Sequence, residues 1–323
     1  TEIRDFDTAF EMESSTQFWE QYKLISHKLK RRFLKKPNIS DAIGEYNTLA
    51  LQQINYNQYT HAACCYIAAS KCEETLKNNS RSAVALTEAA RQFLAAEKET
   101  HSIKCFSFKE NLQMSISCYL SAIKIYLEQN HPSLAVSLYL ELGNNLRHFD
   151  HASEALIYFQ KAADLLLEHP FDYLSTIKHV ASCQIDVGDY SNALDNYTAM
   201  RQKALEQREL FPTQTYEELL SECEISIVLL LMILQPTAQH MKPEHSKIME
   251  MYGWELEDGL PPGVFVDDSL FLYLQSVVLA CHSKDTESLV TLEAQLSPLL
   301  DCQHQDLLRL LVTQMSKMYI QGL

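Results

Sequence analysis

One motif in residues 139–170 constrains the fold of this chain more than any other feature. Two clusters at helical spacing are followed by a proline: Tyr139-x2-Leu142-Gly143-x2-Leu146, then Ala155-x3-Phe159, Ala162 and Pro170. This order matches the tetratricopeptide repeat, a helix–turn–helix unit. Such a helix pair cannot bury its own apolar face, so pairs stack into an array that presents a binding surface. The motif therefore predicts a scaffold and disfavours an enzyme.

Related spacings occur on both sides of this motif. Downstream, Gly188-Asp189 precedes Ala193-x3-Tyr197, and upstream two segments share a small–aromatic–small pattern: Tyr59-x2-Ala62-x3-Tyr66-x2-Ala69 and Ser115-x3-Tyr119-x2-Ala122. A further helical segment over 83–98 separates these two. The spacing fits a period of 3.6 and excludes strands. We expect an all-α fold, namely a tetratricopeptide-repeat-like right-handed α-solenoid of antiparallel helix pairs.

The whole chain, 1–323, is predicted to be a single helical-repeat domain with three parts. An amphipathic basic helix over 14–36 precedes the array at 41–210, and helical hairpins with an acidic loop at 253–268 occupy 215–323. Thr215-x2-Glu218 predicts a capping box for an apolar helix through Leu234, which Pro236 ends. Helices are then expected over 243–252, 269–282, 285–300 and 303–320, with Asp285 or Thr286 as the cap of the third.

Composition excludes several classes of protein. Only 7 of 323 residues are glycine, which disfavours glycine-rich phosphate loops. The formal charge of −15 disfavours nucleic acid as a partner, since phosphate neutralisation needs clustered Lys and Arg. The most apolar run, Ile225–Leu234, is too short to span a bilayer. Nine scattered cysteines and an acidic, polar N-terminus predict reduced thiols in a cytosolic or nuclear protein.

The chain carries no sequence motif of a nucleotide-binding, hydrolase or zinc-protease site. His61, Cys65 and Cys72 share one helical face, but Cys72 lies about 10 Å along a helix from Cys65, too far for one metal ion. We interpret them as buried residues of a helix seam. His148 and His151 are interpreted as an exposed pair at a turn. We therefore expect no catalytic residue, no cofactor and no metal.

Two segments have strongly uneven charge. Residues 21–36 hold seven Lys or Arg and no acid, and Ile248–Ser283 holds six acids and no Lys or Arg. Each is either an ordinary solvated face or a contact surface, since aromatic anchors with charged rims describe many interfaces. The candidate partner-binding residues are Trp254, Glu255, Glu257, Asp258, Phe265, Asp267, Asp268, Phe271, Lys30, Arg31 and Arg32.

Several blocks outside the repeats resemble one known family. They keep their order along nearly the whole chain: FLKKPN at 33–38, ALTEAARxFL at 85–94, VASCQ at 180–184, the run 229–236, PEH at 243–245, YxWE at 252–255 and HxKDTE at 282–287. Together they resemble the huntingtin-associated proteins of 40 kDa, also called the factor VIII intron 22 family. That family carries a long proline-rich insertion where this chain has only Leu210–Thr215, and an Ala/Gly-rich leader that this chain lacks.

The resemblance implies a non-enzymatic protein that binds huntingtin in a 1:1 complex and fills the space between its HEAT-repeat domains. It also implies a link to early endosomes through a Rab GTPase, and a cytoplasmic location that extends to the nucleus. A vesicle-trafficking adaptor similar to the soluble attachment proteins, which grip coiled coils, is the alternative. For that alternative, the basic helix would meet a membrane or a small GTPase.

Overall fold

The regular structure of this protein is helical wherever the computed structural model describes it, in residues 2–30, 38–104, 108–237, 239–253, 261 and 263–321. Those residues form fourteen α-helices and one 3-10 helix, with no strand. The predicted all-α class of stacked helices is thus confirmed. By its internal contacts, the chain divides into two compact units, Thr1–Asn145 (unit 1) and Leu146–Leu323 (unit 2).

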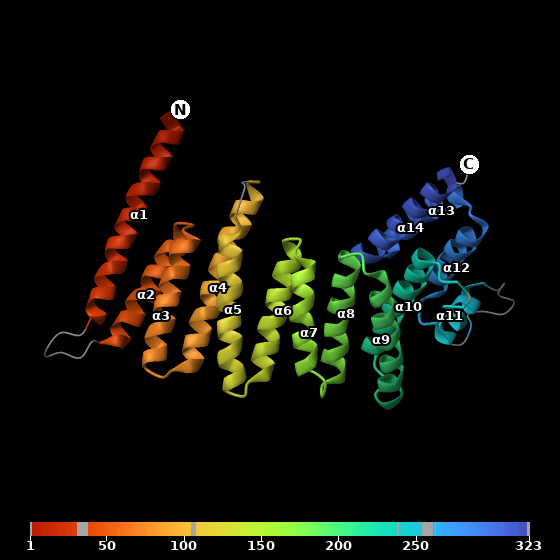
Figure 1. Ribbon diagram of the computed structural model, residues 1–323, viewed down its shortest axis with the longest axis horizontal. Coiled ribbons are helices and arrows are strands. Elements are labelled where there is room, and N and C mark those ends of the chain that lie inside the picture. The colour runs from red at the N-terminus through yellow and green to blue at the C-terminus, as the bar shows by residue number, and fades with distance from the viewer. Residues whose placement is uncertain are drawn as a thin grey trace. The chain divides into compact units, whose positions relative to one another are not determined.

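Unit 1 is a run of helices in which each packs mainly on the next along the chain: α2 on α3, α3 on α4 and α4 on α5. The boundary between the units falls inside α6 (Pro132–His148), which carries the first half of the motif at 139–170. The helices before it, shown in Figure 1, are α1 (Glu2–Leu29), α2 (Ile39–Asn55), α3 (Tyr59–Thr75), α4 (Asn79–Ser102) and α5 (Glu110–Glu128).

Small residues and tyrosines fill the helix seams of unit 1, as their spacing predicted. Ala62, Ser115 and Ala122 have no exposed surface. The Ser115 hydroxyl donates to the Ala90 carbonyl oxygen at 2.9 Å, a contact between α5 and α4 that requires a small side chain. Tyr119 donates its hydroxyl to Glu141 Oε1 at 2.8 Å. The small–aromatic pattern therefore marks the positions where neighbouring helices approach most closely.

Six of the turns between helices share one hydrogen-bond geometry. A residue with positive φ follows the helix, and the next N–H donates to a carbonyl five residues earlier, for example Gln58 to Gln53 at 2.9 Å and Asp189 to Gln184 at 2.8 Å. This is the Schellman arrangement, in which glycine is the usual left-handed residue. Here glycine holds that position at Gly188, while lysine, asparagine or aspartate holds it in the turns at Asn57, Lys77, Asn130, Asp150 and Lys284.

Unit 2 begins with helices that pack in sequence and then changes its packing at α10, which contacts α9, α11, α12 and α14. Its helices are α7 (Ala152–Leu165), α8 (Pro170–Asp186), α9 (Tyr190–Leu210), α10 (Gln214–Leu234), α11 (Pro243–Gly253), α12 (Asp268–Ser283), α13 (Thr286–Leu296) and α14 (Cys302–Gln321), with a 3-10 helix at Ser297–Leu299.

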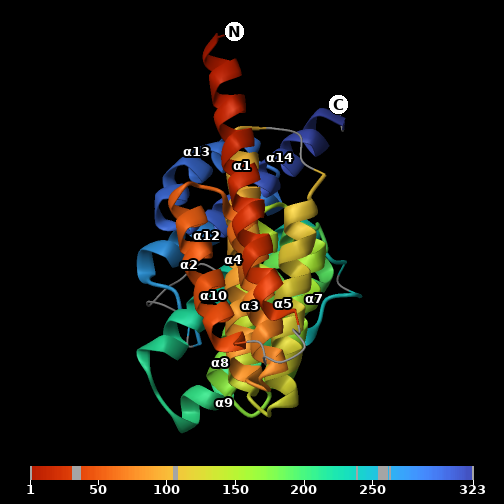
Figure 2. The same cartoon turned by 90° about the vertical axis from the view of Figure 1, so that its left-hand side faces the viewer.

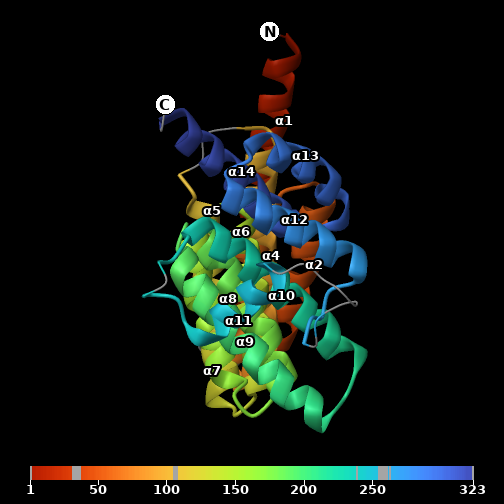
Figure 3. The same ribbon diagram turned by 90° about the vertical axis from the view of Figure 1, so that its right-hand side faces the viewer.

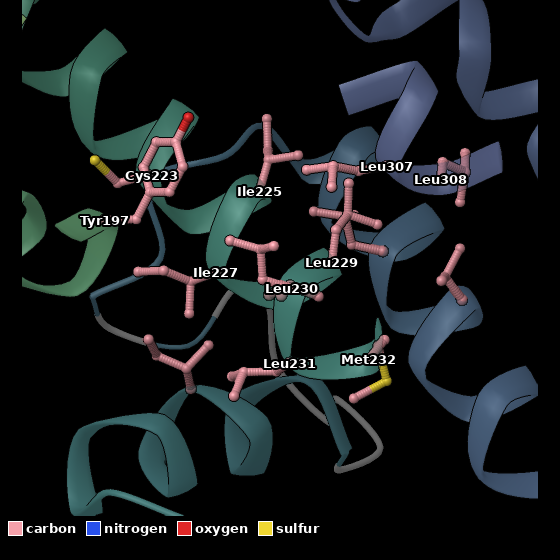
Figure 4. Close-up of a cluster of buried hydrophobic side chains, with 14 of the residues drawn as sticks. Tyr197, Cys223, Ile225, Ile227, Leu229, Leu230, Leu231, Met232, Leu307 and Leu308 are labelled. Carbon is pink, nitrogen blue, oxygen red and sulfur yellow. The ribbon is translucent and has the colours of Figure 1, made fainter. Parts of the chain in front are cut away.

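The predicted apolar core helix is α10, and it is surrounded on all sides. Ile227, Leu229 and Leu230 have no exposed surface, and Figure 4 shows them between Tyr197 of α9 and Leu307 of α14. No helix in the described part of the chain is long and apolar enough to cross a bilayer. Helix α10 is therefore the centre of the unit 2 core, because it is long and contacts α9, α11, α12 and α14.

Helix α14 packs against α8 and α10 through polar contacts. All three helices are labelled in Figure 3. Ser182 of α8 donates to Gln303 Oε1 at 2.6 Å. The Ser226 hydroxyl of α10 lies 2.8 Å from His304 Nε2, and the other ring nitrogen lies 2.9 Å from Asp301 Oδ1. These bonds fix α14 against α8 and α10.

Several predicted boundaries differ from the observed ones. The basic helix predicted over 14–36 corresponds to α1, which spans Glu2–Leu29, while residues 31–36 lie outside the described range. The predicted capping box is wrong: Thr213 is the N-cap of α10, without a side-chain bond, and Thr215 lies inside the helix. Helix α13 ends at Leu296 because Pro298 has no N–H for a further helical bond. Asp285 caps α13, as predicted.

Candidate partner-binding surface

The candidate partner-binding residues fall into two groups by position. Lys30 ends the described part of the N-terminal segment, and four others lie at the start of α12 or just before it: Phe265, Asp267, Asp268 and Phe271. The remaining six lie outside the described residues: Arg31, Arg32, Trp254, Glu255, Glu257 and Asp258.

Tyr252, directly before the acidic loop, and Phe265, within it, are both attached to one buried carboxylate, that of Glu224 in α10. The Tyr252 hydroxyl, at the end of α11, donates to Glu224 Oε1 at 2.6 Å. The Phe265 backbone N–H donates to Glu224 Oε2 at 2.9 Å. Glu224 has no exposed surface, and its burial raises the pKa of this carboxyl, opposed by these two hydrogen bonds and by Arg201. The ends of residues 253–264 are therefore fixed to the core of unit 2.

Two arginines of α9 hold the segment that follows the loop. Arg201 donates to the Gly263 carbonyl oxygen at 3.2 Å. Its guanidinium lies 5.8 Å from the centroid of the Phe265 ring, and that of Arg208 lies 5.2 Å from the same centroid. Contacts of this kind attract the cation to the ring face. Phe265 is half-buried and lies between α9 and α10, so only part of its ring is available to a partner.

Asp267 and Asp268 have different local roles. Asp267 is the N-cap of α12 and accepts from the Leu270 N–H at 2.8 Å. A bond from the Ser269 hydroxyl and this backbone bond lower the pKa of Asp267, so the carboxylate is charged at neutral pH. Asp268 is exposed and makes no cap bond. Both negative charges lie at the N-terminus of α12, where the helix dipole stabilises them.

Phe271 corrects one sequence assignment. Its side chain has no exposed surface and stacks on Tyr252, with ring centroids 4.6 Å apart. A ring enclosed in this way packs the core between α11 and α12 and is not an anchor for a partner. In the sequence, the alternation of acids and aromatics around residue 268 does not distinguish an exposed ring from a buried one.

The surroundings of this segment are acidic in composition. Residues 243–321 contain twelve acids and four Lys or Arg. Such a surface favours basic partners and directs their approach, an effect that salt weakens. Glu224, the carboxylate that supports the segment, was missed by sequence reasoning. The available signal was a charged residue directly before the apolar run 225–234.

The described part of the basic segment up to Leu29 lies on α1, the helix nearest the viewer in Figure 2, which packs through aromatic rings. Phe18 is buried and stacks on His61 at 4.2 Å, while Trp19 is 40% exposed. Lys28 pairs with Glu45 of α2 at 2.6 Å, and Lys30 is exposed. The apolar side of α1 thus docks on α2 and α3, and its basic side faces solvent.

The histidines and cysteines of the described residues form no cluster of three that would hold a metal ion. Cys65 and Cys72 are buried in the seam beside α2, and burial raises the pKa of the Cys65 thiol to about 12. A thiol of this kind stays protonated and unreactive at neutral pH.

Comparison with known proteins gives a match to a family model and similarity to two curated proteins. Residues 35–223 match the model described as "Soluble NSF attachment protein, SNAP". The "40-kDa huntingtin-associated protein" of Rattus norvegicus and that of Mus musculus are each 32% identical over 351 aligned positions, covering 92% of this chain and 92% of the relative. Among solved structures, BtubC (BKLC) from P. vanneervenii is 14% identical, with a TM-score of 0.39 over 80% of this chain and 96% of that one.

Proposed function

Because this chain belongs to the family of the 40-kDa huntingtin-associated protein, we propose that it is a non-enzymatic binding partner of a huntingtin-like HEAT-repeat protein. It fills and stabilises the space between the HEAT-repeat domains of that partner in a 1:1 complex. The observation that carries the proposal is the similarity over 92% of both chains, since a partner surface made of many helices needs the whole array and not one motif.

The acidic loop is proposed as the part of the surface that sets the orientation of the partner. Tyr252 and Phe265, on either side of residues 253–264, are both fixed on Glu224, which sets where this segment leaves and rejoins the core of unit 2. The acidic composition of residues 243–321 fits a basic partner region. Oppositely charged surfaces chiefly increase association rate and specificity, so salt will weaken the effect.

Co-purification from native cells tests the main proposal. The tagged full-length protein should retain one very large HEAT-repeat protein in stoichiometric amount, identified by mass spectrometry. Light scattering of the eluted complex should give one copy of each chain. Absence of such a protein from repeated preparations contradicts the proposal.

Charge reversal tests the role of the acidic loop. The triple variant Glu255→Lys, Glu257→Lys and Asp258→Lys should reduce recovery of the partner at moderate salt. A control with the same change in charge, Glu110→Lys, Glu128→Lys and Asp164→Lys, alters exposed acids on α5 and α7 and should recover the partner normally. Equal recovery by both variants overturns the assignment of the loop.

The family assignment also supports a proposal for the location and trafficking role. We place the protein in the cytoplasm, on early endosomes through a Rab GTPase, and in the nucleus. Fluorescence microscopy of the tagged protein, with and without a dominant-negative endosomal Rab, measures this directly. A signal that never overlaps an early-endosome marker contradicts the endosomal part.

The second candidate is a vesicle-trafficking adaptor that acts without huntingtin. The match of residues 35–223 to the soluble attachment protein model favours it, together with exposed Trp19 and the basic residues that follow. The purified protein should then float with anionic vesicles, and Lys30→Glu, Arg31→Glu and Arg32→Glu together should abolish flotation. No flotation of the unmodified protein removes this candidate.

A further inference from the structure

A cavity of about 600 Å³ opens between α1, α2 and α3 in unit 1, near the end of α1 that leads to α2. Its walls are mostly apolar and come from all three helices: Tyr22, Leu29, Ile39, Tyr46, Ile67 and Cys72. Small-ligand sites span about 300–1,000 Å³ and are lined chiefly by apolar and aromatic side chains. The size and lining of this cavity fall in that class.

The inner wall of the cavity, as formed by the described residues, is buried and uncharged. Tyr46 and Cys72 are nearly fully buried, and the Tyr22 ring lies 5.3 Å from the Tyr46 ring. Burial raises the pKa of the Tyr46 hydroxyl to about 12 and also raises that of Tyr22. Both hydroxyls are therefore uncharged at neutral pH. Such a wall accepts hydrocarbon and excludes a charged group.

The only charged side chain that lines the cavity, among the described residues, is Lys71 of α3, which is exposed at the rim. Among the described residues no acid forms an ion pair with Lys71, whereas Lys28 on α1 is paired with Glu45 at 2.6 Å. Lys30, also exposed, adds a second cation at the end of α1. None of the described residues that line the cavity carries a carboxylate. A ligand that fits this arrangement is long and apolar, with one negative charge at its outer end.

We propose that this cavity binds one molecule of a fatty-acid-like anionic amphiphile, with its hydrocarbon chain between Tyr22 and Ile67 and its carboxylate at Lys71. The proposal goes beyond the binding of a huntingtin-like protein and does not depend on it. A free amphiphile is favoured over a bilayer because the apolar surface is recessed between three helices, and over a partner helix because the space is of small-ligand size.

Fluorescence titration of the purified full-length protein with cis-parinaric acid, below its micelle concentration, tests the proposal. One saturable site per chain is expected, and oleate should displace the probe. Ala68→Phe, which fills the cavity from α3, should weaken binding at least tenfold. Lys71→Glu should weaken binding of oleate at least tenfold and leave displacement by oleyl alcohol, which has no charge, within twofold.

The matched control is Lys124→Glu, which makes the same charge change at an exposed side chain of α5. This variant should bind oleate like the unmodified protein. If Ala68→Phe lowers the melting temperature, Lys71→Glu at the exposed rim decides the outcome. The proposal is overturned if the unmodified protein has no saturable site, if Lys71→Glu binds oleate normally, or if the protein binds anionic vesicles but not monomeric oleate.

Discussion

The Tyr252 hydroxyl donates to Glu224 Oε1 at 2.6 Å in the core of unit 2, and the Phe265 N–H donates to the other oxygen of the same carboxylate at 2.9 Å. This pair of bonds joins the end of α11 and the segment before α12 to the middle of α10. Both bonds therefore lie within unit 2.

Removal of the Tyr252 hydroxyl should destabilise unit 2 measurably. Tyr252→Phe keeps the ring that stacks on Phe271 and deletes one bond to a buried carboxylate, at a cost of about 1.5–3 kcal/mol. Urea unfolding monitored by circular dichroism measures the change. The control is Tyr273→Phe, at a partly buried tyrosine of α12, which should cost much less. Equal stability of Tyr252→Phe and the unmodified protein would contradict the role of this bond.

The raised pKa of Glu224 has a defined effect on stability. The folded state binds the proton more tightly than the unfolded state, whose pKa is near 4.5. The stabilisation that protonated Glu224 gives the folded state is therefore full below pH 4.5, and it is lost as the pH rises through the raised pKa. Glu224→Gln removes this titration, so its free energy of unfolding should fall less than that of the unmodified protein between pH 4.5 and 7.5. Parallel curves would show that Glu224 titrates normally.

Asp301 should change the pH dependence of stability in the opposite direction from Glu224. Its hydrogen bond to His304 is the largest cause that lowers the pKa of this carboxyl from 3.8 to about 2. The contribution to stability is present above pH 3.8 and is lost as the pH falls toward 2. Asp301→Asn should flatten this part of the curve in thermal melts between pH 4 and pH 2. A curve as steep as that of the unmodified protein would refute the assignment.

Gly188 lies in a left-handed turn and Gly44 lies in a helix, so alanine should have opposite effects on stability at the two positions. Gly188 has φ of +81° and open space around a hypothetical Cβ, so Gly188→Ala should cost about 1–2 kcal/mol from backbone conformation alone. Gly44 lies within α2, also in open space, and Gly44→Ala should gain about 0.5–1 kcal/mol. Chemical denaturation of both variants gives the two values. A stabilising Gly188→Ala would contradict the turn geometry.

Docking of α1 should depend on Phe18 and not on its neighbour. Phe18 is 1% exposed and stacks on His61, so Phe18→Ala removes about 3–5 kcal/mol of packing from a helix with few other contacts. Limited trypsin digestion should then cleave α1 at Lys23 and Lys28 well before the rest of the chain. Trp19→Ala, at a 40% exposed ring, should digest like the unmodified protein. Identical digestion of both variants would exclude this role.

The helices of this protein were predictable because their apolar positions are periodic and their seams contain small residues. Ala62, Tyr119 and Ala193 all lie in the buried contacts that their spacing indicated. The turns were harder to predict, since asparagine, aspartate and lysine hold left-handed positions where glycine would have marked them. The helix predicted over 285–300 is longer than α13, because Pro298 ends the α-helix at Leu296.

The candidate surface was less predictable than the fold. Local sequence contains the charge of residues 253–268 but not their support, because Glu224 lies about 40 residues from Phe265 in the chain. The inward position of Phe271 depends on the packing of α11 against α12, which no local pattern shows. Long-range contacts of this kind decide which aromatics are available to a partner.

The attachment of both ends of the acidic loop to Glu224 makes this loop a suitable place for inserted sequence. Tyr252 and Phe265 are fixed by the core independently of the residues between them. An epitope tag or a circularly permuted fluorescent protein inserted there would leave the hydrophobic core of α10–α12 connected. A protease cut at the same place would give two fragments that stay associated. The loop thus offers a fusion point in the segment proposed to contact the partner. A fluorescent reporter inserted there would detect partner binding.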